Sequence, residues 1–441
     1  MPSTRPPVAA ATTVIAAQPR TGYRAVFAVR EFRAMFIAHL LSTLGTVVCE
    51  IALSVLVYRR TGSPLLSALT FALGLLPYVI GGTFLSAVAD RLPARRVLVV
   101  CDLLCAACAA GLVLPGTPVA GLLVLRCLVA AIAPVFTGTR TATLGDVLGE
   151  GDGFVLGSSV IRMTSQSAQL GGFAAGGLLL AAVSPRAVLG LTVGTFLASA
   201  LLLGVGTRRR PARAARGGQT EGALLVASLS GLRQLLADRR VRALLLLAWI
   251  PPMFVVVSEA LLTPYAGSLG TSSAGLGLLL CGMPIGAICS IALAGALLGP
   301  RGRSRLTLPV ALFAMLPPLG YAWHPNLAVA LICQVGSGCG IAYTLGLDQW
   351  FIAAVPERLR GRAMTLLTAG LMTAQGLGMT LAGVAAEFLP IHQVVAGGGV
   401  VGILCVSAVG YLVHRTEASP VDGPVSSTGV EPSTPGRQNR R

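Results

Sequence analysis

Three ionisable side chains lie inside long apolar stretches of the sequence: Glu50, Arg126 and Glu259. A charged group at such a depth in a bilayer is costly. Residues of this kind usually face the protein interior, pair with one another and mark a pathway for ions or substrate. A carboxyl group in such a place can bind and release a proton as its surroundings change. The three residues therefore predict a functional site within the membrane, at which a carboxyl group could bind a proton and Glu259 could contact a cationic substrate.

Two of these residues lie at the same predicted depth and are candidates to pair. Glu50 lies about eight residues before the outer end of the first apolar stretch, and Arg126 about eight residues after the outer end of the fourth. At the helical rise, both lie roughly 12 Å from the same boundary. We expect a buried ion pair, or one that is broken when Glu50 is protonated. The alternative is that both side chains extend separately toward the boundary.

The apolar stretches set the architecture that positions these residues. Of the 441 residues, 54% are hydrophobic and 11% are charged, whereas soluble proteins carry about 25% charged residues. Continuous stretches near the ~20 residues that cross a bilayer favour helices over a barrel. We predict an all-α integral membrane protein with about twelve transmembrane helices in two pseudo-symmetric six-helix bundles. The predicted spans are 34–57, 65–88, 97–114, 119–139, 155–183, 187–206, 243–265, 274–298, 306–323, 327–347, 363–388 and 393–413.

The positive charges predict the orientation. All 33 basic residues are Arg, and most lie before the first span, in alternate gaps, in the central loop and in the tail. The positive-inside rule explains the net charge of +17 better than nucleic-acid binding does. We expect both termini in the cytoplasm and no nucleic-acid partner. The absence of Lys and the abundance of Ala, Gly and Arg indicate a bacterial source, and hence a bacterial cell membrane.

The predicted parts are a disordered cytoplasmic leader (1–33), a first bundle (34–206), a cytoplasmic central loop (207–242), a second bundle (243–413) and a disordered cytoplasmic tail (414–441). Within the central loop, Glu221 to Leu236 has apolar residues at helical spacing. This segment fits a helix on the membrane surface or a plain linker.

Several other functions are disfavoured. The ten Cys lie inside apolar segments, and Cys105 and Cys108 have no other soft ligand nearby, so we expect no metal site. The four His are scattered, and no hydrolase or metalloprotease motif is present, so we expect no enzyme. An ATP-driven pump needs a P-loop Lys, which the chain lacks. No loop resembles the filter of a channel. We expect no cofactor, with a proton gradient as the energy source.

The two halves share landmarks at a constant separation. A shift of 209 residues places Arg33 on Arg242, Glu50 on Glu259 and Arg96 on Arg305. A shift of 206 residues places Gln169 on Gln375. Two parallel repeats are the arrangement of transporters that bind substrate between two halves near the bilayer midplane.

These features resemble the major facilitator superfamily over residues 30–415. The family signature Gly-x-x-x-Asp-Arg-x-Gly-Arg-Arg is matched by Asp90, Arg91 and Arg95, with Arg96 next to them, although Ser86, Pro93 and Ala94 depart from it. A remnant in the second half keeps Gly295, Gly299, Arg301 and Arg303 without the Asp. The resemblance implies a cytoplasmic gate latch, in which a carboxylate pairs with Arg in one conformation. The alternative is that these Arg only set topology.

Two further matches concern the helices. Leu122-x-x-x-Arg126-x-x-x-Ala130 is similar to the family's fourth-helix signature, whose Arg is tied to proton coupling. The Gly-rich stretch from Gln169 to Gly177 resembles that of drug antiporters but lacks the Pro, and packing alone also explains it. Gln169 and Gln375 are candidate polar residues of the cavity. The loop from Pro356 to Arg362 resembles that of macrolide and siderophore exporters.

Together these features predict a secondary active transporter that works by alternating access. The resemblance implies a proton-coupled antiporter for efflux of a hydrophobic or amphiphilic small molecule, such as a drug, an antibiotic or a secondary metabolite, with a role in antibiotic resistance. The alternative is a proton-coupled importer of a metabolite, sugar or siderophore on the same fold. We expect a monomer whose partners are the lipid bilayer and a small-molecule substrate.

Overall fold

The computed structural model describes residues 23–78, 81, 91–149, 152–210 and 233–417. Its described residues form helices and connecting turns, without a strand. Ten of the helical segments are long and apolar enough to cross a membrane. The predicted all-α membrane architecture is therefore confirmed. Of the twelve expected spans, 65–88 falls partly outside the described residues, and 155–183 corresponds to the 31-residue helix α8.

The helices of the first half are α1 (Tyr23–Ala28), α2 (Arg30–Thr61), α3 (Pro64–Ala72), α6 (Ala94–Val113), α7 (Val119–Leu148), α8 (Asp152–Ala182) and α9 (Pro185–Gly206). Those of the second half are α11 (Arg239–Ser268), α12 (Ser273–Leu297), α13 (Pro300–Phe313), η3 (Pro317–Trp323), α14 (Leu327–Cys339), η4 (Gly340–Tyr343), α15 (Thr344–Ala354), η5 (Glu357–Leu359), α16 (Arg360–Phe388) and α17 (Ile391–Glu417).

Several helices begin where the sequence supplies a cap. The side chains of Ser63, Ser184, Ser272 and Asn326 each accept a hydrogen bond from a backbone N–H in the first turn of the following helix. These bonds satisfy donors that a helix start leaves free. All four caps lie in the short connections on one side of the molecule, so each pair of consecutive helices turns tightly there.

Some predicted boundaries differ from the structure because helices continue beyond the apolar core. The predicted leader ends at residue 33, yet α1 and the first turn of α2 occupy its last part. The predicted tail begins at residue 414, but α17 continues to Glu417. In the central loop, α11 already begins at Arg239. Most of the segment predicted as a surface helix, 221–232, lies outside the described residues.

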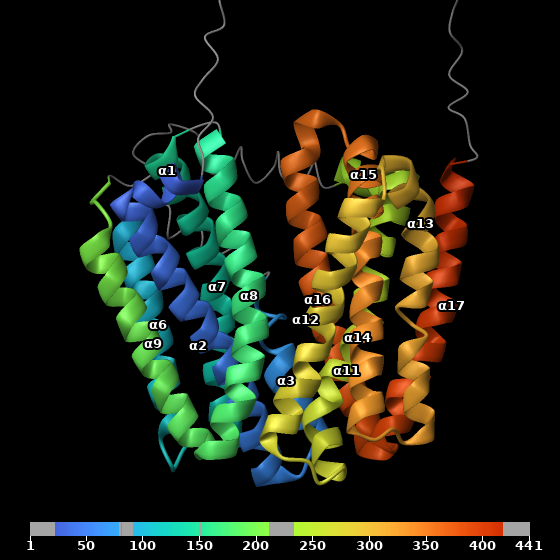
Figure 1. Ribbon diagram of the computed structural model, residues 1–441, viewed down its shortest axis with the longest axis horizontal. Helices are drawn as coiled ribbons and strands as arrows, with labels where there is room; N and C mark the ends of the chain where they lie inside the picture. Colours follow the sequence, from blue (N-terminus) through green and yellow to red (C-terminus); the bar gives the residue numbers. More distant parts are fainter. Residues whose placement is uncertain (1–22, 79–80, 82–90, 150–151, 211–232, 418–441) are drawn as a thin grey trace, which may run out of the picture.

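The two halves stand side by side and meet at one end (Figure 1). We call the face where α2 starts and α17 ends the terminal face, and the other the opposite face. Toward the opposite face, Ser54 Oγ lies 2.7 Å from Thr263 Oγ1, and Leu65 N donates to Glu387 Oε1 at 3.0 Å. Gly177 of α8 lies directly against Gly277 of α12. At the terminal face the ribbons of the two halves diverge (Figure 1).

The outer surface of the helices is apolar. Leu201 and Val205 of α9, Leu297 of α12 and Leu404 of α17 are each more than 60% exposed. A soluble protein rarely exposes so much contiguous apolar surface. These side chains therefore face lipid, and the polar residues described below are buried between helices.

Candidate substrate and proton-coupling site

The core of the site is an ion pair between α2 and α7. Arg126 Nη2 lies 2.8 Å from Glu50 Oε1, and the two side chains are 6% and 19% exposed. The Nε of Arg126 also donates to the carbonyl oxygen of Thr70 at 3.2 Å. The ion pair expected from the depths of the two residues is thus present. Because an isolated charge at this depth would be costly, each residue stabilises the charged form of the other.

A glycine makes room for this arginine. A Cβ atom built on Gly74, in the turn after α3, would lie 2.1 Å from Arg126 Nη2 and 2.9 Å from the carbonyl oxygen of Phe71. Real Cβ atoms do not approach other atoms so closely. A side chain at position 74 would therefore occupy the space that the guanidinium fills where it contacts Glu50.

Glu259 lies close to the axis that relates the halves. Ser54 of α2 and Thr263 of α11 are hydrogen-bonded and 209 residues apart, the same separation as Glu50 and Glu259. Each acid precedes its hydroxyl residue by one helical turn, so the two carboxyl groups flank the Ser54–Thr263 contact. Glu259 is half-buried and makes no side-chain hydrogen bond to the described residues. One acid is therefore paired and its counterpart is not.

A cavity of about 280 Å³ opens beside the ion pair within the first half. One face of α2 lines it with His39, Thr43, Thr46 and Glu50, which recur every three or four residues. This spacing places them on one stripe of the helix. Apolar side chains of Val129, Ile132, Phe136 and Phe196 complete the wall. The cavity thus offers both polar and apolar contacts.

A second buried polar group lies at the end of this cavity nearer the terminal face. Arg140 Nη1 donates to His39 Nδ1, and His39 Nε2 lies 2.8 Å from Ser165 Oγ. Since a guanidinium can only donate, Nδ1 accepts, and the proton of the neutral ring is on Nε2, which donates to Ser165. Asp102 accepts hydrogen bonds from Ser42 at 3.3 Å and from Ser199 at 2.5 Å.

Two charged residues are more deeply buried than hydropathy alone suggests. Arg140 follows an apolar stretch, in a gap where hydropathy favours a topology-setting loop, but it lies inside α7 and is 8% exposed. The helix continues past the apolar segment because its polar end packs against α2 and α8 rather than facing solvent. Asp102 lies near the end of an apolar stretch, a position typical of the membrane interface, but it is 1% exposed between α2 and α9. The stripe of His39, Thr43 and Thr46 was also missed, although its helical spacing is visible in the sequence.

The remaining candidate residues are less involved. Gln169 and Gln375 are half-buried, and neither lines the cavity. For the latch, Asp90 lies outside the described residues, and Arg91 is exposed. Arg301 and Arg303 were expected in a loop but lie in the first turn of α13, where Arg303 Nη2 donates to the carbonyl oxygen of Gly295 at 2.7 Å. That bond satisfies a carbonyl group in the last turn of α12. Arg95 and Arg96 begin α6.

The same architecture occurs in known proteins. A sequence model described as Major Facilitator Superfamily matches residues 35–350. The chain belongs to the Major Facilitator Superfamily. It is therefore a membrane transporter and not an enzyme. No curated protein sequence matches this transporter.

Solved structures share its fold. A bacterial homologue of the human lysosomal transporter Spinster, in an inward-facing and unoccupied conformation, superposes with a TM-score of 0.63 and 16% identity, over 90% of this chain and 96% of that chain. A peptide transporter of the POT type in complex with alafosfalin gives 0.65 and 16%, over 90% and 96%. The nucleoside transporter NupG gives 0.62 and 14%, over 87% and 98%. At these identities the likeness concerns the fold alone.

Proposed function

We propose that this transporter couples proton movement to the efflux of an amphiphilic small molecule by alternating access. The observation that carries the proposal is the Glu50–Arg126 ion pair on the wall of a buried cavity, at 2.8 Å. A proton on Glu50 removes the negative charge that holds the guanidinium. Arg126 is then released to contact other groups, including the substrate.

Glu259 gives this proton site a counterpart in the other half. It flanks the Ser54–Thr263 contact from the α11 side, one helical turn away, as Glu50 does from the α2 side. Two like charges near one contact repel each other in a medium of low dielectric constant. Protonation of either acid lowers this repulsion and favours the arrangement in which the halves meet at the opposite face. Proton binding thereby biases which face is open.

The composition of the cavity wall supports an amphiphilic substrate. His39, Thr43 and Thr46 offer hydrogen bonds, whereas Phe136 and Phe196 offer apolar surface. Drugs, antibiotics and secondary metabolites with both polar and apolar parts fit such a wall. One chain, a proton gradient and no cofactor are sufficient for this mechanism.

The sequence supports the direction of transport and the orientation. The Arg-rich ends favour a terminal face in the cytoplasm of a bacterial cell, and this is the face at which the ribbons of the two halves diverge (Figure 1). The resemblance of the loop from Pro356 to Arg362 to those of exporters supports efflux, and hence a role in antibiotic resistance. The arginine latch around Asp90 and Arg91 would hold the cytoplasmic ends together in the alternate state.

Transport into inside-out vesicles tests this function. Vesicles that contain the protein are given an inward-acidic gradient and a panel of lipophilic dyes and antibiotics, with and without an uncoupler. We expect uptake that the uncoupler abolishes, that Glu50→Gln and Arg126→Ala each abolish, and that Glu357→Gln leaves unchanged, because Glu357 is 89% exposed. Equal transport by Glu50→Gln and the unchanged protein would refute proton coupling at this pair. Gradient-driven uptake only into right-side-out vesicles would show import instead.

A further inference from the structure

A basic pocket lies at the outer edge of the first half, away from the cavity. It has a volume of about 490 Å³ between the start of α6 and the end of α9. Four arginines line it: Arg95 and Arg96 in the first turn of α6, and Arg209 and Arg210 just after α9. No acidic residue is among its lining residues. The pocket therefore concentrates positive charge. Two of its four arginines, Arg209 and Arg210, belong neither to the ion pair nor to the expected latch.

One of the four arginines is already engaged. Arg210 donates to both carboxylate oxygens of Glu31, at 2.5 and 2.9 Å, and the backbone N–H of Arg208 donates to the same carboxylate. The hydrogen bonds to Glu31 raise the pKa of Arg210, so it remains a cation. This pairing fixes the backbone beyond α9 and holds Arg209 near α6. Arg95, Arg96 and Arg209 leave the pocket with a net positive charge.

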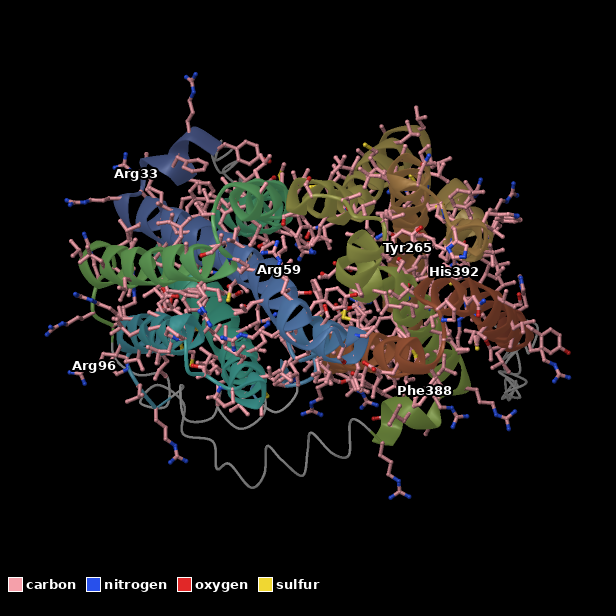
Figure 2. The ribbon with its side chains drawn as sticks, turned by 90° about the horizontal axis from the view of Figure 1, so that it is seen from below. Arg33, Arg59, Arg96, Tyr265, Phe388 and His392 are labelled. Carbon is pink, nitrogen blue, oxygen red and sulfur yellow. The ribbon has the colours of Figure 1, made fainter. Side chains whose placement is uncertain are left out.

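The surface on the membrane side of the pocket is apolar. Val99, Val100 and Gly204 line its inner wall. Further along the same helices toward the opposite face, Leu104 of α6 and Leu201 of α9 are 49% and 67% exposed. Arg96 lies at the outer margin of the molecule in the view from the opposite face (Figure 2). The arginines of the pocket therefore lie next to a lipid-facing apolar surface, at the terminal-face end of α6 and α9.

We propose that this pocket binds an anionic phospholipid, with the phosphate among Arg95, Arg96 and Arg209 and the acyl chains along α6 and α9. Guanidinium groups match phosphate oxygens in charge and geometry. Basic pockets between transmembrane helices at the headgroup level bind anionic lipids. A free phosphate would use the same arginines but would gain nothing from Val100, Leu104 or Leu201. The proposal does not depend on the substrate or on proton coupling.

Lipid binding to the purified full-length protein tests the proposal. The protein in detergent is titrated with phosphatidylglycerol or phosphatidylcholine of matched chains, and bound lipid is counted by native mass spectrometry. We expect tighter retention of phosphatidylglycerol. Arg96→Gln/Arg209→Gln should weaken it about thirtyfold, since each arginine contributes roughly fivefold. The charge-matched control Arg301→Gln/Arg358→Gln removes two exposed arginines outside the pocket and should bind as the unchanged protein does.

Further measurements distinguish binding of a whole lipid from simple attraction of an anion to the positive charge. Arg96→Lys/Arg209→Lys keeps both positive charges and should retain most of the binding. This variant also keeps the proposal testable if the Gln variant does not fold. Glycerol phosphate, which has the headgroup chemistry without chains, should compete only at far higher concentration. Equal retention of the two lipids, equal loss in the control pair, or competition by glycerol phosphate at the same concentration as the lipid would each overturn the proposal.

Discussion

The contact between Gly177 and Gly277 allows a direct test of alternating access. A Cβ atom on Gly177 would lie 2.6 Å from the Cα of Gly277 and 3.0 Å from its N, and it would lie 3.0 Å from the carbonyl oxygen of Ser273. All three are backbone atoms, so no side chain can swing aside. Ordinary carbon contacts are about 3.5 Å or longer. Gly177→Ala therefore forces α8 and α12 apart by roughly 1 Å.

The expected magnitude follows from this displacement. Overpacking of this kind costs about 1–3 kcal/mol. The cost falls only on the state in which the opposite face is closed, because α8 and α12 separate there in the alternate state. The equilibrium between the two states should shift about 5- to 150-fold toward opening of the opposite face.

Cross-linking at the opposite face measures this shift. In a background in which the ten native cysteines are replaced, Ser63→Cys and Glu387→Cys mark two residues that are hydrogen-bonded across the halves. A short thiol-specific cross-linker should join them more slowly in Gly177→Ala, in proportion to the smaller fraction of molecules whose opposite face is closed. Gly190→Ala, at a glycine with open space around it, should have no effect. An unchanged rate in Gly177→Ala would refute the assignment of this contact to one closed state.

Two further predictions concern the ion pair. Glu50→Gln and Arg126→Met should each lower the melting temperature in detergent, because each single change leaves a buried group unpaired. The double substitution should reduce the free energy of unfolding by about 1–3 kcal/mol less than the sum of the two single changes. Additive effects would contradict the pairing. Gly74→Ala should displace the guanidinium and abolish gradient-driven transport while insertion persists, whereas Gly138→Ala, at a helical glycine with no atom near its Cβ position, should transport normally.

Residue depth along each helix was sufficient to predict part of the site. Apolar length defined most spans, and depth put Glu50 and Arg126 at the same level, because an α-helix advances by a fixed rise per residue. That their two helices face each other was implied by the family resemblance and not by depth. The same rule could not reveal the second polar group. Arg140 follows Thr139 at the end of an apolar run, so hydropathy alone places it in a loop. Only the packing of α7 against α2, through the hydrogen bond to His39, shows that its charge is buried.

Asp102 shows a different limit. Its depth fits a residue near the membrane interface, and the neighbouring sequence does not indicate which residues form hydrogen bonds with it. Its two hydrogen-bond donors, Ser42 and Ser199, come from α2 and α9, more than fifty residues away on either side. Buried polar groups are satisfied by whichever helix lies alongside, which is a property of the three-dimensional arrangement. The glycine at position 74 could not be predicted for the same reason, because it is required by the space that Arg126 of another helix occupies.

The internal repeat explains why one acid is paired and the other is not. The Ser54–Thr263 bond joins residues 209 apart, so the axis that relates the halves passes close to this contact. Glu50 and Glu259 are then equivalent by position, yet only the first half supplies an arginine at the depth of Arg126. The residue 209 positions after Arg126 is Val335, which carries no charge. The asymmetry lets the two acids respond differently to one proton, and a perfectly symmetric pair of halves would lack any such difference. On this reasoning, Val335→Arg should give Glu259 a partner of its own and reduce the dependence of transport on the proton gradient.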